Sequence, residues 1–324
     1  MLIRRAATLL AYVFSILVSV WTAHAQTWPD RPVRIIVPYP PGGSTDITAR
    51  LVSEKLTQAM GQRFFIDNRP GAGGNVGMEA AAQAAPDGYT VAVATTAHAI
   101  NMSLFRNLNY HTLTSFTPVA LLTENPLVLV ANPAVPARSV QELVALAKQK
   151  PGGLNYASSG NGQSTHLAAE LFASMAGIKL VHVPYRGSAP AIADVIAGHV
   201  QIMFDTTQSV LTHVEDGRVR ALGMTSSARL PAAASIPTLQ ESGLPGYEAI
   251  AWNGFLVPKG TPDAIVTQLN AEVVRALQDP DLTERFRKLG ATTRPTTSTE
   301  FGTYIAAEIH KWGKVVRESG AKVD

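Results

Sequence analysis

The chain repeats one pattern of apolar and polar positions in its two halves. A short run rich in β-branched residues at 33–37 predicts a buried strand, and a Pro/Gly/Ser loop at 40–46 follows it. Apolar residues then recur at helical spacing over 47–56. The same order of strand, small polar loop and helix returns at 154–157, 158–165 and 167–177. Elements in this order predict a parallel sheet with right-handed crossovers.

Further segments extend this pattern. The other predicted strands are 64–66, 89–94, 179–183, 200–204 and 219–224, and the other predicted helices are 76–85, 139–150, 188–197, 262–277 and 299–318. Ser139 and Glu142 form a capping box, and Thr261 is the expected N-cap before Pro262. Residues 95–98 and 205–207 are expected to be loops at strand ends.

Two long extended segments, 116–130 and 249–257, interrupt the alternation and predict strands that pass between two lobes. The first lobe is then discontinuous, 26–124 with 250–324, and the second is 125–249. The length of 324 residues suits two domains. The pattern therefore predicts a two-lobed α/β protein with a hinge between the lobes.

The first 25 residues describe a secretory signal peptide. Arg4 and Arg5 precede an apolar segment at 6–20, and Ala23-His24-Ala25 is a cleavage site of the A-x-A kind. The alternative is a membrane anchor, but the apolar segment is short for a span. We expect cleavage after Ala25, export, and no membrane insertion of the mature chain.

Composition excludes several function classes. There is no cysteine, which excludes disulfides, thiol catalysis and thiolate metal sites and suits a periplasmic protein. Without the leader, 25 Lys and Arg face 24 Asp and Glu, and no basic tract suggests a nucleic-acid partner. The histidines lack metal-ligand spacing. Hydroxyl residues have no activating base nearby, so an enzyme on this frame is the less favoured hypothesis, and no cofactor is expected.

Two loops are candidate anion sites, because the first N–H groups of a helix have no internal partner and lie at its positive dipole end. The first contains Gly42, Gly43, Ser44, Thr45 and Asp46, with Ser44 or Thr45 as a possible cap. The second contains Ser158, Ser159, Gly160, Asn161, Gly162 and Thr165. Each alone is also compatible with an ordinary capped turn. One loop from each lobe is what gripping a single anion requires.

Three charged or titratable residues have two possible roles each. His166 lies one turn into the second helix and is either a ligand contact or a structural histidine. Asp205 follows a strand and either accepts a hydrogen bond from a ligand N–H or hydroxyl, or caps the next segment. Arg186 either faces the ligand or is solvated or between the lobes.

The residues resemble a known family. The motifs that carry the resemblance are VPYPPGGSTD (37–46), DNRPGAGGN (67–75), DGYT (87–90), YASSGNGQSTHLAAELF (156–172), VPYRGSAPAIADVIAGHVQIMFD (183–205) and GFLVPKGTP (254–262). Together they are similar to the Bug-type receptors, the periplasmic solute-binding proteins of the tripartite tricarboxylate transporter family. The resemblance covers essentially the whole mature chain. Asp67 departs from the glutamate usual at that position.

The resemblance implies a periplasmic-binding-protein fold of type II, with mixed, mostly parallel sheets joined by two crossing strands. It also implies a small carboxylate held by loops 42–46 and 158–165. The more variable positions that read the rest of the ligand are Thr95, Thr96, His98, Tyr185, Asp205 and Thr206. The implied partners are membrane permease subunits, or a histidine kinase if the protein is a sensing co-receptor. We expect a monomer in the periplasm.

Overall fold

The computed structural model describes residues 28–319 and 321–323, so the predicted signal peptide lies outside the described residues. The strands are β1 (Val33–Val37), β2 (Phe64–Asn68), β3 (Thr90–Thr95), β4 (Phe116–Ala131), β5 (Asn155–Ser158), β6 (Val181–Pro184), β7 (Ile202–Thr206), β8 (Arg220–Met224), β9 (Ile250–Pro258) and β10 (Thr292–Thr293). The α-helices are α2 (Ser44–Met60), α3 (Asn75–Ala82), α4 (Thr96–Leu104), α5 (Val140–Gln149), α6 (Ser164–Ala176), α7 (Ser188–Ala197), α8 (Thr207–Glu215), α9 (Asp263–Gln278), α10 (Pro280–Lys288) and α11 (Ser298–Ser319). Two 3₁₀ turns are η1 (Ala72–Gly74) and η2 (Pro231–Ala233).

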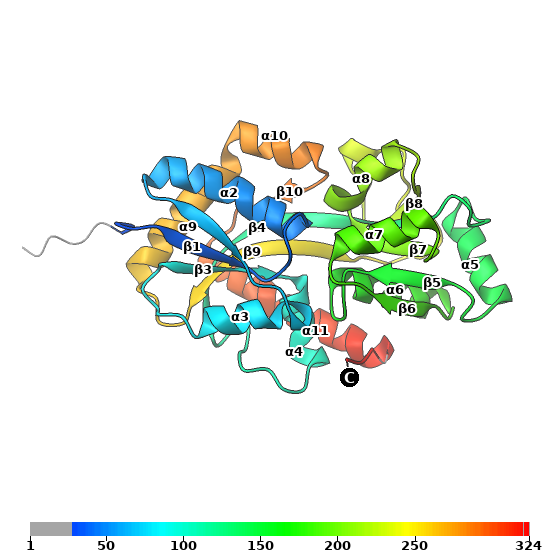
Figure 1. Ribbon diagram of the computed structural model, residues 1–324, viewed down its shortest axis with the longest axis horizontal. Coiled ribbons are helices and arrows are strands. Elements are labelled where there is room, and N and C mark those ends of the chain that lie inside the picture. The colour runs from blue at the N-terminus through cyan, green and yellow to red at the C-terminus, as the bar shows by residue number, and fades with distance from the viewer. Residues whose placement is uncertain (1–27, 320, 324) are drawn as a thin grey trace, which may run out of the picture.

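One sheet runs through the molecule in the order β2-β1-β3-β9-β4-β7-β5-β6, with β8 and β10 also paired to β4. The long strand β4 belongs to both halves of this sheet. Its residues 116–126 pair with β9, its residues 127–131 pair with β7, and its residues 128–131 pair with β8. We call lobe 1 the part with β1–β3, β10, α2–α4 and α9–α11, and lobe 2 the part with β5–β8 and α5–α8. Figure 1 shows β4 and β9 side by side between the lobes. The predicted two-lobed fold with two crossing strands is confirmed; the boundaries at 124/125 and 249/250 stay a prediction.

Helices cover both faces of the sheet, which explains why β1 is apolar at every position except Arg34. Val33, Ile35 and Val37 pack in a cluster with α2 and α9, whereas Ile36 packs on the opposite face. A strand buried on both faces shows no alternation, and only Arg34 in β1 is partly exposed.

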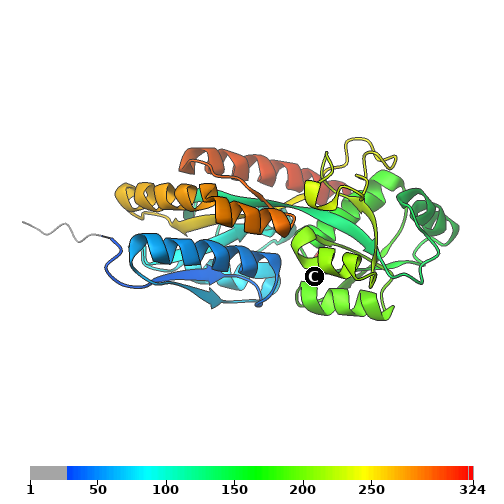
Figure 2. The same ribbon diagram turned by 90° about the horizontal axis from the view of Figure 1, so that it is seen from above.

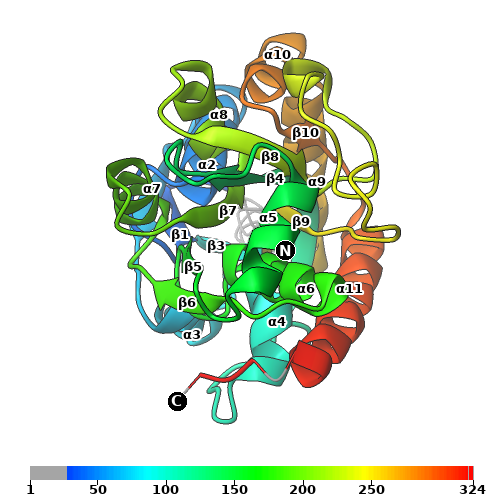
Figure 3. The same ribbon diagram turned by 90° about the vertical axis from the view of Figure 1, so that its right-hand side faces the viewer.

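The long helix α11 joins the lobes on one side. It packs against α4 of lobe 1, against β4 and against α6 of lobe 2. Figure 3 shows α11 beside α4 and α6, and Figure 2 shows it, in red, along one side of the molecule. Its buried Glu308 accepts hydrogen bonds from the indole N–H groups of Trp252 (2.9 Å) and Trp312 (2.8 Å). The crossing strand β9 is thereby fixed to α11.

Several predicted details are wrong. Residues 96–98 and 207 are helical, because Thr95 and Thr206 end their strands and are at once the N-caps of α4 and α8. The N-cap of α2 is Gly43, with no side-chain cap from Ser44 or Thr45. The N-cap of α9 is Pro262 and not Thr261. The helix α10, capped by Asp279, was not predicted.

The described helices include no candidate for a membrane span. Among the described residues there is also no group of three or more His, Cys, Asp or Glu placed to hold a metal ion.

Candidate ligand-binding site

The loop at 42–46 is held by a network of charged and polar hydrogen bonds around Asp46. The Asp46 carboxylate accepts from the backbone N–H of Gly42 (3.0 Å), from Arg50 Nε and Nη2 (2.9 and 3.0 Å) and from Asn68 Nδ2 (3.0 Å). Burial raises the pKa of Asp46, but the hydrogen bonds from Arg50, Asn68 and Gly42 outweigh burial and leave that pKa lowered. Asp46 therefore fixes the conformation of the loop through its hydrogen bonds to Gly42, Arg50 and Asn68, and both of its oxygens are already occupied.

The loop at 158–165 is held by hydroxyls instead. Thr165 Oγ1 accepts from the backbone N–H of Ser159 (2.9 Å) and lies 2.8 Å from Ser159 Oγ. Ser158 Oγ accepts from the backbone N–H of Gly160 (3.2 Å) and lies 2.6 Å from His182 Nε2. These bonds close a tight turn in which Ser158 and Thr165 are buried, whereas Ser159 is only half-buried.

A stack of three rings supports this second loop. The imidazoles of His166 and His182 lie 4.0 Å apart and nearly parallel, and Tyr156 stacks on His182 at 4.8 Å. His166 Nδ1 accepts from the backbone N–H of Gly162 (3.2 Å), and the Tyr156 hydroxyl donates to Glu170. Of its two possible roles, the geometry therefore favours a structural one for His166.

Both stacked imidazoles are neutral. Burial lowers the pKa of His182 to about 4, and burial together with the neighbouring His182 lowers the pKa of His166 to about 3. A neutral His166 that accepts at Nδ1 carries its proton on Nε2. The hydrogen bonds described for the second loop itself thus come from neutral groups, and the charged Glu170 bonds Tyr156 at the far end of the stack.

The helices α2 and α6, which begin at these two loops, lack side-chain caps, and so do α7 and α8 of lobe 2. The N-caps of α2, α6, α7 and α8 are Gly43, Gln163, Gly187 and Thr206, and none accepts a capping hydrogen bond from the first turn. By contrast, Ser139 of α5 and Asp279 of α10 each accept such a bond. The helix α9, with Pro262 as N-cap, is also uncapped. Uncapped first-turn N–H groups are available to an anion.

The two lobes meet at the loops. Gln163 Nε2 of lobe 2 donates to the backbone oxygen of Gly73 in lobe 1 (3.0 Å). A Cβ added to Gly162 would lie 2.7 Å from Asn101 Oδ1, and one added to Gly187 would lie 3.8 Å from Pro40. Gly187 in turn donates to the backbone oxygen of Ser159 (3.1 Å). These contacts place residues 162 and 163 of the second loop against lobe 1. They also place Gly187, which is bonded to the second loop, near Pro40, two residues before the first loop.

Other predicted positions of lobe 1 lie at the start of α4. Thr95 Oγ1 bonds the Tyr39 hydroxyl (2.9 Å), and its backbone N–H donates to His98 Nδ1 (2.9 Å). Burial lowers the pKa of His98 to about 3, and its Nε2 makes no hydrogen bond of acceptable geometry within the described part of the chain. Thr96 Oγ1 accepts from the backbone N–H of Trp252 (2.9 Å), so Thr96 anchors β9.

The remaining predicted positions belong to lobe 2. Tyr185 donates from its hydroxyl to Asp194 (2.6 Å) and from its backbone N–H to Ser158 (3.0 Å). Arg186 and Asn161 are exposed. Asp205 and Thr206 are buried at the end of β7, and Asp205 Oδ1 accepts from the backbone N–H of Thr206 (2.8 Å) and from Ser188 Oγ (3.1 Å). Of these, the exposed Arg186 is the least favoured as a ligand contact.

Sequence reasoning missed Gln163, Tyr39 and His182. Gln163 bridges the lobes, Tyr39 contacts Thr95, and His182 supports Ser158. The partners of Gln163 and His182 lie far away in the chain, so no local pattern predicts these two contacts. The only local signals were the Pro-Tyr-Pro sequence around Tyr39 and the polar loop that contains Gln163.

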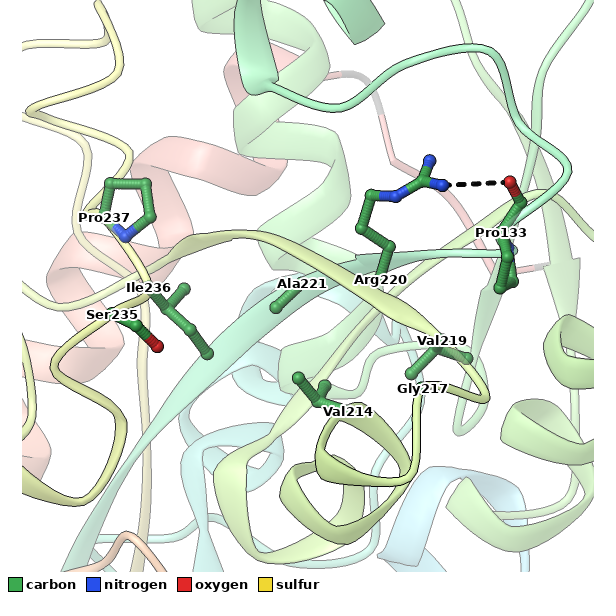
Figure 4. Close-up of a pocket in the computed structure, with 9 residues that line it drawn as sticks. All are labelled: Pro133, Val214, Gly217, Val219, Arg220, Ala221, Ser235, Ile236 and Pro237. Carbon is green, nitrogen blue, oxygen red and sulfur yellow. Dashed lines mark hydrogen bonds between the residues drawn. The ribbon is translucent and has the colours of Figure 1, made fainter.

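A separate pocket of about 380 Å³ lies on lobe 2 (Figure 4). It shares no residue with either loop. Its cation, Arg220, donates to the backbone oxygens of Pro133 (3.1 Å), Val135 (3.2 Å) and Ala137 (2.9 Å). The guanidinium is therefore already engaged, and this pocket is not the anion site.

The fold defines a class: two α/β lobes joined by two crossing strands are the architecture of periplasmic solute-binding proteins. The family model described as "Tripartite tricarboxylate transporter family receptor" (TctC) matches residues 48–321. The chain belongs to this family, as its motifs predicted.

Relatives and solved structures agree with this assignment. The chain is 38% identical over 301 residues to Protein BugT of Bordetella pertussis, covering 92% of each chain. It is similar to the structure "R. palustris Rpa4515 with adipate" (TM-score 0.88, 37% identity, 91% of this chain and 100% of that one). It is also similar to "MatC (Rpa3494) from Rhodopseudomonas palustris with bound malate" (TM-score 0.85, 35% identity, 89% and 100%).

Proposed function

We propose that this protein is a periplasmic receptor that closes on a small carboxylate and presents it to the permease subunits of a tripartite transporter. The observation that carries the proposal is the absence of side-chain caps on α2 and α6, the helices that begin at the two glycine loops. The helices α7 and α8 lack side-chain caps as well. The bound adipate and malate of the two similar structures support the choice of a carboxylate.

Backbone donors suffice for such binding. A hydrogen bond to a charged group contributes roughly 1.5–3 kcal/mol, and a micromolar dissociation constant corresponds to about 8 kcal/mol. Several N–H groups of residues 43–45 and 164–165, helped by the half-exposed hydroxyls of Ser44 and Ser159, therefore reach micromolar affinity without an arginine. The Gln163 N–H is not among them, because it donates to the Gly160 backbone oxygen (3.3 Å). The exposed position of Arg186 fits this account.

The cellular setting rests on the sequence and the family. The signal peptide places the mature protein in the periplasm, and we propose that it acts there as a monomer. A sensing role with a histidine kinase would use the same site. Deletion of the gene separates the two roles: a transport receptor is needed for growth on the ligand, whereas a sensing co-receptor is needed for gene induction by the ligand. We assign no catalytic role.

A thermal-shift panel of carboxylates, amides and amines tests the proposal. A ligand that binds only the folded protein at a hundred times its Kd adds about 2.7 kcal/mol of stability, so at least one carboxylate must raise the melting temperature. Ser159→Trp fills the second loop and should remove this shift. The control Ser174→Trp lies on the exposed side of α6 and should keep it. Stabilisation by amines alone, or no stabilisation by any acid, contradicts the proposal.

A further inference from the structure

Asp205 is a buried carboxyl group that the anion site does not explain. It is 1% exposed, and its Oδ2 has no hydrogen-bond partner within the described part of the chain. Its Oδ1 accepts from two neutral donors, the Thr206 N–H and the Ser188 hydroxyl. A buried carboxylate oxygen without a donor is costly, whereas a protonated one can itself donate.

The position of Asp205 joins it to the binding loops. It lies at the carboxyl end of β7, on the same face as Met203, toward α7 and α8. Its partner Ser188 begins α7, and the preceding Gly187 both donates to Ser159 and approaches Pro40 of lobe 1. The Asp205 carboxyl group is thus hydrogen-bonded to Ser188, the residue that follows Gly187, and Gly187 is the residue near Pro40 of lobe 1.

No cation compensates Asp205 among these neighbours. Within the described part of the chain, Asp205 accepts hydrogen bonds from Thr206 and Ser188 and from no titratable side chain. The titratable groups on the elements that pack against β7 are His166 and Glu170 on α6, Asp194 on α7, His213 and Glu215 on α8, Tyr156 on β5 and Glu124 on β4. In lobe 1, Asp46 is paired with Arg50. Burial raises the pKa of Asp205 to about 7, against the lowering effect of the bonds from Thr206 and Ser188.

We propose that Asp205 takes part in binding as the neutral carboxylic acid, so that the receptor binds its carboxylate together with one proton. This inference rests on the proposed function, because two ionised carboxylates in one closed site would repel each other. The Oδ2–H group then donates to the ligand, and the unpartnered atom acquires its acceptor. The bound solute keeps its negative charge, and the proton comes from the medium.

Calorimetric titration with adipate and malate at pH 5.5 to 9, in two buffers of different ionisation enthalpy, tests the proposal on the unaltered protein. We expect uptake that rises from about half a proton per ligand at pH 7 toward one proton above pH 8, and an affinity that falls up to about tenfold for each further pH unit. Asp205→Asn, in which Nδ2 takes the place of the protonated oxygen, should bind with pH-independent affinity and without proton uptake. The control Asp216→Asn alters an exposed carboxylate paired with Arg218 and should keep the pH dependence.

The outcomes separate this inference from the proposed function. Tight carboxylate binding with no proton uptake and no pH dependence overturns the role of Asp205 and leaves the receptor function intact. Affinity that rises with pH, limited to acids that also carry an ammonium group, overturns it as well, because Asp205 would then accept as a carboxylate. If no carboxylate binds at any pH, the proposed function itself fails.

Discussion

The loops 42–46 and 158–165 present the same feature, an uncapped helix N-terminus, but they are held in place by different chemistry. The first depends on the ionised Asp46 with Arg50 and Asn68, and the second on hydroxyls backed by the neutral rings of His166 and His182. The difference teaches that the anion site needs a fixed backbone and not a particular side chain. It also gives the two loops different sensitivities, which the following variants exploit.

The largest effect is expected where the loops of both lobes touch. Gly162→Leu places a side chain at φ +75°, where a Cβ would lie 2.7 Å from Asn101 Oδ1 and 3.0 Å from Leu104. The variant should fold but fail to close, with carboxylate affinity reduced by about a hundredfold or more, since most contacts to the ligand form on closure. Calorimetry measures the loss, and small-angle scattering should show a more open molecule.

The control for this variant is Gly177→Asn. Gly177 also has a positive φ, but no atom lies within 4 Å of its Cβ position, and Asn tolerates this conformation. Its affinity should stay within about twofold of the unaltered protein. Unchanged binding by Gly162→Leu would show that the lobes do not need this contact.

Asp46→Asn breaks the charged support of the first loop. The amide keeps one acceptor oxygen where the carboxylate has two, so either Gly42 N–H and Arg50 Nε or Asn68 Nδ2 and Arg50 Nη2 lose their acceptor. Arg50 also loses its charged bidentate partner. Removing charge-assisted hydrogen bonds worth roughly 1.5–3 kcal/mol each should lower stability and weaken the ligand about tenfold. Chemical denaturation and calorimetry measure the two effects. Glu54→Gln, an exposed carboxylate on the same helix, is the control; equal losses in both variants would contradict the role of Asp46.

His182→Phe separates the two functions of the ring stack. Phenylalanine keeps a planar ring against Tyr156 and His166 but lacks the Nε2 that lies 2.6 Å from Ser158 Oγ. We expect a three- to tenfold loss of affinity, about the value of one hydrogen bond, with only a small change in melting temperature. His182→Gln restores a polar nitrogen and should recover part of the affinity. Full affinity in the Phe variant would show that Ser158 needs no such support.

The same variant sharpens the comparison through pH. The pKa of His182 is about 4 in the folded protein and about 6.5 in the unfolded chain, so the unfolded chain binds more protons between these values. Stability therefore falls as pH falls from about 6.5 to 4, and His182→Phe should remove that part of the fall. The lowered pKa of Asp46 acts only below its ordinary value of 3.8, so Asp46→Asn should leave the slope between pH 6.5 and 5 unchanged. Equal slopes in the parent and His182→Phe would contradict the neutral stack.

The smallest effect is expected for Arg186→Ala. The side chain is exposed, and the account assigns anion binding to backbone donors. Affinity should change by less than about twofold at moderate salt, since exposed charges are screened. A tenfold loss measured by calorimetry would show that a side-chain cation does hold the ligand.

The sequence predicts the architecture well where a pattern is local. The β-branched run at 33–37, interrupted only by Arg34, marks a strand covered on both faces, and the long extended segment at 116–130 is the strand β4 that passes between the lobes. The helices α4 and α8 were not predicted, because Thr95 and Thr206 belong to a strand and cap a helix at once, with no intervening turn residue. No local pattern marks such a junction.

The site was predictable as a pair of loops but not as a network. The position of Asp46 after Gly42-Gly43 is visible in the chain, yet its partner Asn68 lies 22 residues away. Ser158 and His182 are 24 residues apart, and Gly73 and Gln163 are 90 apart. These contacts depend on how the strands assemble, so residue type alone could not show that Asp46 and His166 hydrogen-bond within their own loops. Their role as ligand contacts stays a prediction.

A crystal structure of the protein with a bound carboxylate tests the central claim most directly. The account predicts both oxygens of one carboxylate group within hydrogen-bond distance, about 2.7–3.2 Å, of backbone nitrogens from residues 43–45 and 164–165. A carboxylate held by Arg186, or bound in the pocket beside Arg220 with both loops unengaged, would contradict it.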